Sequence, residues 1–558
     1  MTTLTGQPST EAAGGPHEAA PAAPVRAGDR RGWPLWAQVL LVLAVCAAVY
    51  WPGLGYAGFT ATEGHRVIPG WTMLQSGDWL RSEMFELGYL RKPPGMSWAV
   101  AVASAVLGET EVAARAVSAL SITATALLCA LFAARWMGAR WAAYAGVACA
   151  MMPLLWGYGR AAEIEALNTV MTAAAALALA DLCLPRAASM GVARAAPMVL
   201  LAAVGILGAA LAKGPASAPV LAGVPLGACL MQRSAAPLRR PGVWMAVGLA
   251  ALAGAPIAAA VLGANAQPET VRQGIGEFLW RPDRIVGILL LPAVAFGAAL
   301  PMSLGLLFPF GPDAVREGER SAADRRAADA ARTLAGGWVM AVAMYTAVGL
   351  SNPRYVAPAA VLLPPLVAYA ARGWMGPDPA FVYLRRVLAR LAFGWWRGVA
   401  VAGLIIGATI TIPLTEVQRA RASGRWAGEA IAGALAPAAE EGGVIEIWAD
   451  MMIETRPEVL LYAQRALAAG GSPGRLRPVW AKGAVSEAQL PPVGAYLLLK
   501  TTDTDAEPPR YAEAIERGEL ERVLEGKVHK FGYALYRVRG EGSSREGEEE
   551  GGRPGDSR

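Results

Sequence analysis

The sequence predicts a helical domain that crosses a membrane many times, followed by a small soluble α/β domain. Of its 558 residues, 55% are hydrophobic and only 17% are charged, whereas soluble domains carry about 25% charged residues. The apolar residues form runs close to the roughly 20 residues that a helix needs to span a bilayer. Short strand-like and helical segments alternate only after about residue 415, which indicates a separate α/β region. A single soluble globule, a coiled coil and a collagen-like fibre are excluded.

The net charge of +6 does not indicate a nucleic-acid-binding protein. The Lys and Arg residues are scattered between apolar segments, where the ends of membrane helices require them, and no basic run is interleaved with aromatic residues. The five cysteines all lie in apolar segments and form no CxxC pair, so we interpret them as small buried side chains. We therefore expect the lipid bilayer, and no nucleic acid, as a partner.

The membrane domain is predicted to cover residues 31–414. Residues 1–30, rich in Ala, Pro and Gly, are expected to form a disordered tail. The arginines at 26, 30 and 31 precede the first apolar run, which we interpret as an uncleaved transmembrane helix with its N-terminus in the cytoplasm. About eleven spans are predicted in all, over residues 35–54, 112–134, 140–157, 164–184, 196–212, 215–232, 243–262, 284–309, 334–350, 355–372 and 397–414.

The segment Pro93–Leu107 decides the topology. It is apolar but has only about 15 residues, too few to cross a bilayer untilted. If it lies on the membrane surface, every loop between later spans that is assigned to the cytoplasmic side carries arginine, as the positive-inside rule requires. We therefore predict an interfacial helix on the outer face. The result is a multi-pass protein of a bacterial inner or plasma membrane, with a cytoplasmic N-terminus and an extracytoplasmic C-terminal domain.

Charged and polar side chains collect on the predicted outer face. Ionisable residues at a membrane edge are costly and are functional candidates by default, although each alone could be an interfacial anchor or a helix cap. The candidates come from the loop 55–111 and from three shorter outer loops. They are Glu63, His65, Lys92, Arg160, Glu163, Glu165, Lys213, Arg354 and Tyr355.

Several motifs in these loops carry a family resemblance. The first outer loop contains SGDW at 76–79 and KPP at 92–94, and later loops contain LAKGP at 211–215 and RYVAP at 354–358. With this spacing, roughly residues 35–375 resemble the lipid-dependent glycosyltransferases of the GT-C superfamily. The resemblance is to the branch that contains the aminoarabinose transferase of lipid A and the protein O-mannosyltransferases. It implies a GT-C-like fold with about eleven transmembrane helices and outer-face interfacial helices.

The resemblance also implies an activity. A hexosyl or pentosyl group would move from a polyprenyl-phosphate donor to a hydroxyl or phosphate of a glycolipid, glycan or protein acceptor, as in lipopolysaccharide or protein glycosylation. The family carries an aspartate where this chain has Thr62, and its second-loop aspartate position is Glu165. We therefore expect the adjacent Glu63 to be the catalytic carboxylate and Glu165 to support it.

The chemistry of such a transfer assigns roles to the other candidates. Cations aimed at the leaving phosphate stabilise the transition state more than the ground state, and we expect Lys92 and Arg354 to bind this phosphate. Lys213 or Arg160 could assist. The possible accessory residues are His65, Glu163 and Tyr355. No metal site is predicted, but a divalent metal shared by Glu63 and His65 stays open.

Two other functions stay open. A polytopic transporter would also have many spans, although it should carry charges within them and show inverted halves. A non-catalytic GT-C-like subunit would explain why Thr62 replaces the expected aspartate. Incorporation of a labelled sugar by the purified protein would separate both alternatives from the transferase.

The C-terminal domain is predicted over residues 415–540. Segments 444–448, 495–500 and 533–538 have the pattern of strands, and 424–440, 455–469 and 509–524 that of helices. The domain contains neither a GxGxxG motif nor a nucleophile motif, so we interpret it as a structural cap or an acceptor-docking domain. Residues 541–558 are expected to be a disordered acidic tail.

Overall fold

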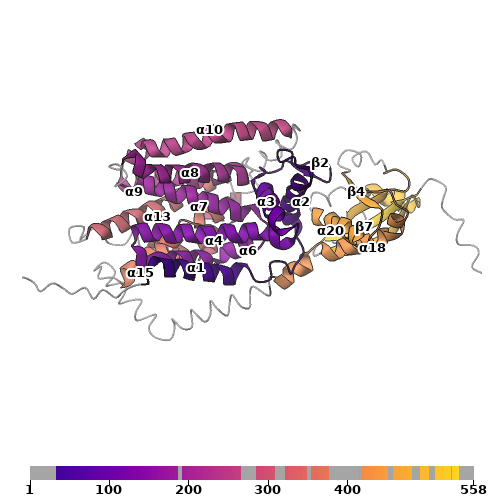
Figure 1. Cartoon of the computed structure of the whole chain (residues 1–558), viewed down its shortest axis with the longest axis horizontal. Helices are drawn as coiled ribbons and strands as arrows, with labels where there is room; N and C mark the ends of the chain where they lie inside the picture. The colour runs from indigo at the N-terminus through magenta and orange to yellow at the C-terminus, as the bar shows by residue number, and fades with distance from the viewer. Residues whose placement is uncertain are drawn as a thin grey trace, which may run out of the picture.

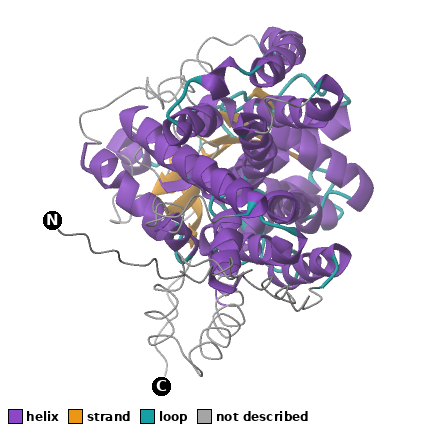
Figure 2. Cartoon of the chain, turned by 90° about the vertical axis from the view of Figure 1, so that its left-hand side faces the viewer, coloured by secondary structure: helices purple, strands orange, loops and turns teal. Residues whose placement is uncertain are grey.

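The computed structural model shows a helical bundle with a smaller, sheet-containing region beyond one of its ends (Figure 1). In Figure 2 the bundle is seen from its other end, with the strands behind the helices. The predicted tails, nearly all of the predicted span 397–414 and most of the loop 263–283 lie outside the described residues. The structure describes residues 33–185, 191–265, 285–307, 321–348, 353–375, 414, 416–449, 456–480, 490–501, 509–528 and 531–539.

Several bundle helices can cross a membrane. Among the described residues, four apolar helical stretches are long enough by length and composition. They are α4 (Glu111–Trp136), α7 (Ile164–Cys183), the continuous stretch Ala193–Gln232 formed by α8 (Val192–Lys213) and α9 (Ala218–Gln232), and α10 (Pro241–Ala264). The chain is thus a multi-pass membrane protein, and the number of eleven spans stays a prediction. The remaining bundle helices are α1 (Leu35–Tyr50), α5 (Ala142–Ala150), α6 (Pro153–Gly159), α12 (Ile285–Ala298), α13 (Ala322–Val348), α14 (Ala357–Ala360) and α15 (Pro364–Met375).

Proline interrupts two of the predicted spans. The predicted span 140–157 is divided between α5 and α6, because Met152 is extended immediately before Pro153. The predicted span 355–372 is divided between α14 and α15, and α15 begins at Pro364. Proline lacks a backbone N–H and disfavours the helical conformation of the residue before it. Hydropathy alone does not reveal such breaks.

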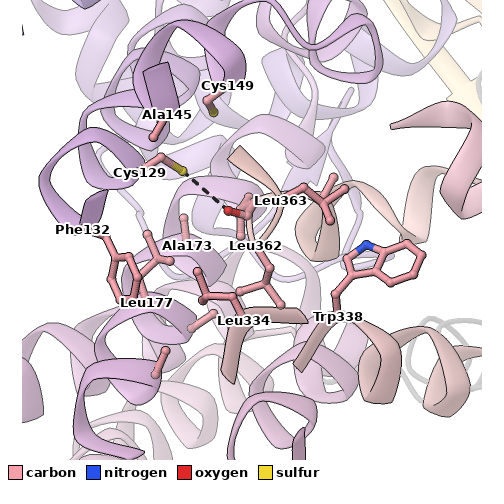
Figure 3. Close-up of a cluster of buried hydrophobic side chains, with 14 of the residues drawn as sticks. Cys129, Phe132, Ala145, Cys149, Ala173, Leu177, Leu334, Trp338, Leu362 and Leu363 are labelled. Carbon is pink, nitrogen blue, oxygen red and sulfur yellow. Dashed lines mark hydrogen bonds between the residues drawn. The ribbon is translucent and has the colours of Figure 1, made fainter. Parts of the chain in front are cut away.

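The centre of the bundle is packed with small and aliphatic side chains (Figure 3). Phe132 from α4, Leu177 from α7 and Leu334 from α13 belong to one buried cluster. Cys129 lies in the same cluster, and its Sγ contacts the carbonyl oxygen of Val361 at 3.6 Å. All five cysteines are free, and four of them are buried, in agreement with their interpretation as small core residues.

Glycines bring α9 and α13 into backbone contact. A Cβ atom added to Gly227 would lie 2.2 Å from the backbone carbon of Gly336, and one added to Gly223 would lie 2.8 Å from the nitrogen of Ala341. Side chains larger than hydrogen are therefore excluded at these two positions. Close approach through small residues is a common way to pack membrane helices. We call this contact, which also includes Gly337, the glycine seam.

Two helices lie at the end of the bundle nearest the sheet (Figure 1). They are α2 (Ala61–Ser76) and α3 (Gly95–Leu107). A capping box of Thr60 and Glu63 begins α2, and Gly77 ends it with a φ of 75°, which glycine adopts readily. The helix predicted within 93–107 is confirmed as α3, and its depth in the membrane stays a prediction. A short hairpin of β1 (Glu83–Met84) and β2 (Leu87–Gly88) lies between them.

The C-terminal region is a mixed five-stranded sheet with helices, as its α/β pattern predicts. The strand order is β4-β3-β5-β7-β6, in which β4, β3 and β5 are parallel and β5, β7 and β6 are antiparallel. The strands are β3 (Val444–Ala449), β4 (Arg475–Trp480), β5 (Tyr496–Thr501), β6 (Leu520–Val528) and β7 (Phe531–Val538), and the helices are α18 (Arg425–Glu440), α20 (Pro457–Ala469) and α21 (Pro509–Glu516).

The helix predicted over 509–524 is wrong in its second half. The helix α21 ends at Glu516, and Gly518, with a φ of 76°, turns the chain into β6. The three predicted strands are confirmed, whereas β4 and β6 were not predicted. Four of the nine residues of β6 are charged, Glu521, Arg522, Glu525 and Lys527, and they hide the strand pattern.

Hydrogen bonds link the C-terminal region to the end of the bundle nearest the sheet. The Tyr462 hydroxyl accepts the backbone N–H of Phe59 at 2.7 Å and donates to Glu111 at 2.8 Å. Arg425 donates to the same Glu111 carboxylate at 2.7 Å. Helices α18 and α20 thereby contact both the start of α4 and the segment that leads into α2.

Candidate functional site

Most of the predicted site residues lie at the end of the bundle that faces the C-terminal region. They come from the start of α2, the turn before α7, the last residue of α8 and the short turn Pro353–Tyr355 that follows α13 in the chain. These are helix ends and connections, where backbone groups lack helical partners and where side chains can reach a ligand.

Lys213 and Glu165 form a buried ion pair within this cluster. The Lys213 Nζ lies 2.9 Å from Glu165 Oε1, and both side chains are about 3% exposed. Lys213 ends α8 and Glu165 lies in the first turn of α7, positions at which the helix dipoles favour these charges. The ammonium also lies 4.6 Å from the centre of the Tyr355 ring. The second carboxylate oxygen, Glu165 Oε2, is buried and has no hydrogen-bond partner among the described residues.

Arg354 extends this positive cluster. Its guanidinium lies 5.4 Å from the centre of the Tyr355 ring, and it acts electrostatically on both Glu165 and Lys213. Lys92 also acts electrostatically on Lys213. The structure therefore brings three of the four predicted phosphate-binding residues to one place, together with Tyr355.

An apolar groove leads away from these cations. It has a volume of about 830 Å³ and runs between α8 and α10, and Arg91, Lys92 and Lys213 are its charged lining residues. Gly95 allows the loop before α3 to approach α8 closely, since a Cβ atom there would lie 2.6 Å from the Leu211 carbonyl oxygen. Aliphatic side chains and glycines form most of the walls, among them Ile206, Leu207, Ala210, Leu211, Val247, Ala251, Gly254, Ala258, Val261 and Leu262.

Glu163 is hydrogen-bonded to Thr62, whose Oγ1 donates to Glu163 Oε1. Burial and then the Glu165 carboxylate raise the pKa of Glu163 to about 7, against the opposing effects of the Thr62 hydroxyl and Arg66. A carboxyl group with this pKa can change its protonation near neutral pH, as a general base must.

Glu63 has the contacts of a structural anchor rather than those of the predicted catalytic carboxylate. Its side chain is 1% exposed and accepts hydrogen bonds from Arg115 at 2.8 and 2.9 Å and from the backbone N–H groups of Thr60 and Ala162, both at 2.9 Å. Burial alone would raise the pKa of Glu63, but Arg115 and these bonds lower it to about 2. Both oxygens are occupied, and the carboxylate is a weak base.

Arg115 is an important residue that is not among the predicted site residues. It is fully buried in α4, and besides Glu63 it donates to the carbonyl oxygens of Leu54, Ala57 and Gly58 at 2.7 to 2.9 Å. The predicted span 112–134 is apolar apart from this one arginine. A lone arginine inside an apolar helix was the available signal, because such a residue must find a partner.

Arg160 is also a structural anchor. It was predicted to assist in binding phosphate, but protein groups already occupy its guanidinium. Its side chain is 2% exposed. It donates to Glu416 at 3.1 Å and to the carbonyl oxygens of Val49 and Pro52 at 2.8 and 2.6 Å. These contacts tie the end of α1 to the segment that leads into the C-terminal region, so the guanidinium is already occupied by protein groups.

His65 is buried on α2 and its ring lies 5.6 Å from that of Tyr89. The described part of the chain contains no group of three or more His, Cys, Asp or Glu side chains that could hold a metal ion. A metal ion shared by His65 and Glu63 would therefore find no third ligand of these types among the described residues. Glu63 is in any case engaged by Arg115.

The geometry defines a polytopic membrane protein with a charged site at the mouth of an apolar groove. No protein-family model matches the chain, and no curated protein matches its sequence. The solved structures similar to it include two of ArnT from Cupriavidus metallidurans. The form bound to undecaprenyl phosphate has a TM-score of 0.63 and 18% identity, covering 89% of this chain and 98% of that chain. The apo form has a TM-score of 0.64 and 17% identity, covering 90% and 98%. The predicted resemblance is thus confirmed at the level of the fold.

Proposed function

We propose that this protein is an integral-membrane glycosyltransferase that moves a sugar from a polyprenyl-phosphate donor to an acceptor on the outer face of the membrane. The observation that carries the proposal is the apolar groove with Arg91, Lys92 and Lys213 among its lining residues. An isoprenoid chain matches the aliphatic walls, and a phosphate matches the cations. The structurally similar ArnT is bound to undecaprenyl phosphate, which supports this kind of ligand.

The cations suit the departure of a lipid phosphate. As the bond between the sugar and the phosphate breaks, negative charge grows on the phosphate oxygens, and preorganised cations stabilise that charge. Lys92 and Lys213 would act as point charges, whereas Arg354 would offer paired N–H donors. Glu165 and Tyr355 hold Lys213 in place.

The same site can bind the sugar itself. The buried Glu165 Oε2 has no hydrogen-bond donor among the described residues, and a buried acceptor without a donor is costly. A sugar hydroxyl would supply the donor. The donor would then sit with its phosphate at Lys213 and its sugar beside α7.

The proposal includes a topology and a setting. The N-terminus would be cytoplasmic, the C-terminal region extracytoplasmic, and the membrane a bacterial inner or plasma membrane. The transferred group would be a hexosyl or pentosyl unit, and the acceptor a glycolipid, glycan or protein. Nucleotide sugars are absent outside the cytoplasm, so a donor used at the outer end of the bundle would be carried across the membrane on a lipid phosphate.

The test is binding of undecaprenyl phosphate to the purified protein, followed by transfer. Losing one charged hydrogen bond to phosphate should cost about 1.5–3 kcal/mol, so Lys92→Ala and Arg354→Ala should each weaken binding tenfold or more. Lys527→Ala, an exposed change on β6, is the matched control. Undecaprenol, which lacks the phosphate, should bind less tightly to the wild type and equally to all variants.

Transfer is tested with a panel of radiolabelled undecaprenyl-phosphate sugars and membranes as the source of acceptor. Incorporation of label by the wild type is the expected result, and it separates a transferase from a transporter or a non-catalytic subunit. Equal affinity for undecaprenol and undecaprenyl phosphate, or normal binding in both alanine variants, would overturn the phosphate site. Binding without incorporation of any label would leave a lipid-binding protein that is not a transferase.

A further inference from the structure

The identity of the proton acceptor follows from comparing the carboxylates near the site. Glu63 is occupied by Arg115 and two backbone N–H groups. Asp78 accepts the backbone N–H groups of Leu80 and Arg81, both at 3.1 Å, and is exposed. Each of these carboxylates has a structural task in a turn or an ion pair.

Glu165 is likewise unsuited to take a proton. Its Oε1 receives the Lys213 ammonium at 2.9 Å, and a carboxylate beside a cation holds its negative charge. Protonating it would break a buried ion pair, and a buried cation left alone is strongly destabilising. Glu165 therefore orients Lys213 and can accept a hydroxyl without gaining the proton.

Glu163 differs from the other three. Within the described residues, the Thr62 hydroxyl is the single hydrogen-bond partner of its carboxylate, so Oε2 is available. It is partly exposed at the start of α7, two residues before Glu165. Glu163 lies next to the Lys213 cluster and therefore beside the proposed position of the donor phosphate. Among the described residues, its carboxylate forms no ion pair.

We propose that Glu163 is the general base of the transfer and that Thr62 positions its carboxylate. This inference rests on the proposed glycosyltransferase function. The oxygen of the acceptor hydroxyl forms a bond to the anomeric carbon of the sugar. The bond from that carbon to the phosphate oxygen breaks, and its electron pair leaves with polyprenyl phosphate. The hydroxyl proton passes to Glu163, which becomes a neutral carboxylic acid and later returns the proton to water.

Thr62 thereby acquires a role that its residue type alone does not indicate. A threonine hydroxyl cannot accept a proton near neutral pH, but as a donor it fixes one oxygen of Glu163 and directs the other outward. The hydrogen bond also favours the ionised form of the carboxylate. Thr62 is thus a positioning residue, and the proton goes to its partner in the second outer loop.

The charged groups around Glu163 determine the pH dependence. Glu165 and Glu63 disfavour its ionisation, whereas Arg66 and the Thr62 hydroxyl favour it, and together with burial they raise its pKa to about 7. Lys213 and Arg354 act on Glu165. The transfer rate of the wild type should therefore fall as the pH drops below about 7, because the base becomes protonated.

The test compares transfer rates at several pH values for Glu163→Gln and Glu63→Gln, with undecaprenyl-phosphate sugar as donor. Loss of a general base costs about 10²–10⁴ in rate, so Glu163→Gln should lose at least a hundredfold and also lose the acid limb of the pH profile. Glu63→Gln should keep the acid limb, because Glu163 is still present. Binding of undecaprenyl phosphate should be unchanged in Glu163→Gln.

Two changes at Thr62 test the positioning role. Thr62→Val removes the hydrogen bond that favours the ionised carboxylate, so the acid limb should move to higher pH. Thr62→Asp places a second carboxylate beside Glu163, and two neighbouring carboxylates share a proton. The acid limb should therefore also move to higher pH, with no gain in rate.

Three outcomes would overturn the proposal while leaving the proposed function intact. They are a Glu163→Gln rate within threefold of the wild type, an unchanged acid limb in that variant, and a large rate increase in Thr62→Asp. If the wild type transfers no sugar from any donor of the panel, the proposed function itself fails, and the base assignment fails with it. Difference infrared spectroscopy of the carboxylic acid C=O stretch is the second readout. It should show a group that titrates near pH 7 in the wild type and is absent in Glu163→Gln.

Discussion

Replacing Arg115 by Met should destabilise the end of the bundle nearest the sheet more than it changes the chemistry of the candidate site. Arg115 is fully buried and gives its N–H groups to Glu63 and to three backbone carbonyl groups. Methionine fills part of the space but donates no hydrogen bond. The Glu63 carboxylate would then be buried without a counter-charge. The segment before α2 would lose the hydrogen bonds that Arg115 donates to its backbone carbonyl groups.

The magnitude can be worked out in two ways. Removing one partner of a buried ion pair costs about 3–5 kcal/mol. Independently, the partners of Glu63 lower its pKa from 4.5 to about 2, which corresponds to about 3 kcal/mol of net stabilisation. Because the pKa in the folded state is lowered, this contribution is present above the ordinary pKa of a glutamate. It is lost as the pH falls towards about 2.

The assay is hydrogen exchange of the purified protein in detergent, together with its thermal unfolding. Arg115→Met should speed exchange at the start of α2 and lower the unfolding temperature. Arg522→Met is the matched control, because its ion pair with Glu525 lies on the surface and surface pairs contribute about 0–1 kcal/mol. Glu63→Gln should be destabilised less than Arg115→Met, since the amide still accepts hydrogen bonds.

Two results would refute this reasoning. Unchanged exchange at α2 in Arg115→Met would show that the ion pair does not stabilise the segment before α2. A Glu63→Gln variant with wild-type stability but at least a hundredfold slower transfer would show that Glu63 is the catalytic carboxylate, as its motif position predicted. Either result is accessible without knowing the natural acceptor.

Three further predictions concern the groove, the C-terminal region and the topology. Ala258→Trp should fill part of the groove and weaken binding of undecaprenyl phosphate at least tenfold. The control Leu252→Trp, on the same helix but outside the groove lining, should bind normally. Equal affinities of the two variants would show that the lipid lies elsewhere. Tyr462→Phe should lower the stability of the contact between the C-terminal region and the bundle by about 1–3 kcal/mol, because Glu111 loses one hydrogen-bond donor. Limited proteolysis should therefore release the C-terminal region faster than in the wild type. An unchanged cleavage rate would contradict this prediction. A reporter fused after residue 540 should be active only outside the cytoplasm, and activity restricted to the cytoplasm would reverse the proposed topology.

Hydropathy and motif spacing were sufficient to predict the helical bundle and the α/β region, and they singled out residues most of which lie at one end of the bundle. Apolar runs mark helices whatever their partners are, which explains why α4, α7 and α10 begin and end close to the predicted limits. Proline breaks such as the one at Pro153 were less visible, because proline is also tolerated inside membrane helices. The strand β6 was missed because its exposed face is charged.

The roles of individual charged residues could not be predicted in the same way. Arg160 and Glu416 are 256 residues apart, and Glu63 and Arg115 are 52 apart, so no local pattern reveals that they are paired. A motif position indicates that a residue matters but does not say whether its charge is free or already compensated. The contrast between Glu63 and Glu163 depends on contacts that only the folded chain shows.

The glycine seam between α9 and α13 has a consequence for where harmful substitutions can occur. The helix α9 follows Lys213 in the chain, and α13 precedes the turn that carries Tyr355. The seam therefore fixes how far apart the lysine and the aromatic ring stand, although Gly227 and Gly336 are several helical turns from either. A methyl group at Gly227 would wedge the two helices apart and move the ring away from the ammonium. Variants altered there should bind the lipid phosphate poorly although every charged side chain is intact, because the defect lies in the spacing of the helices and not in the binding residues.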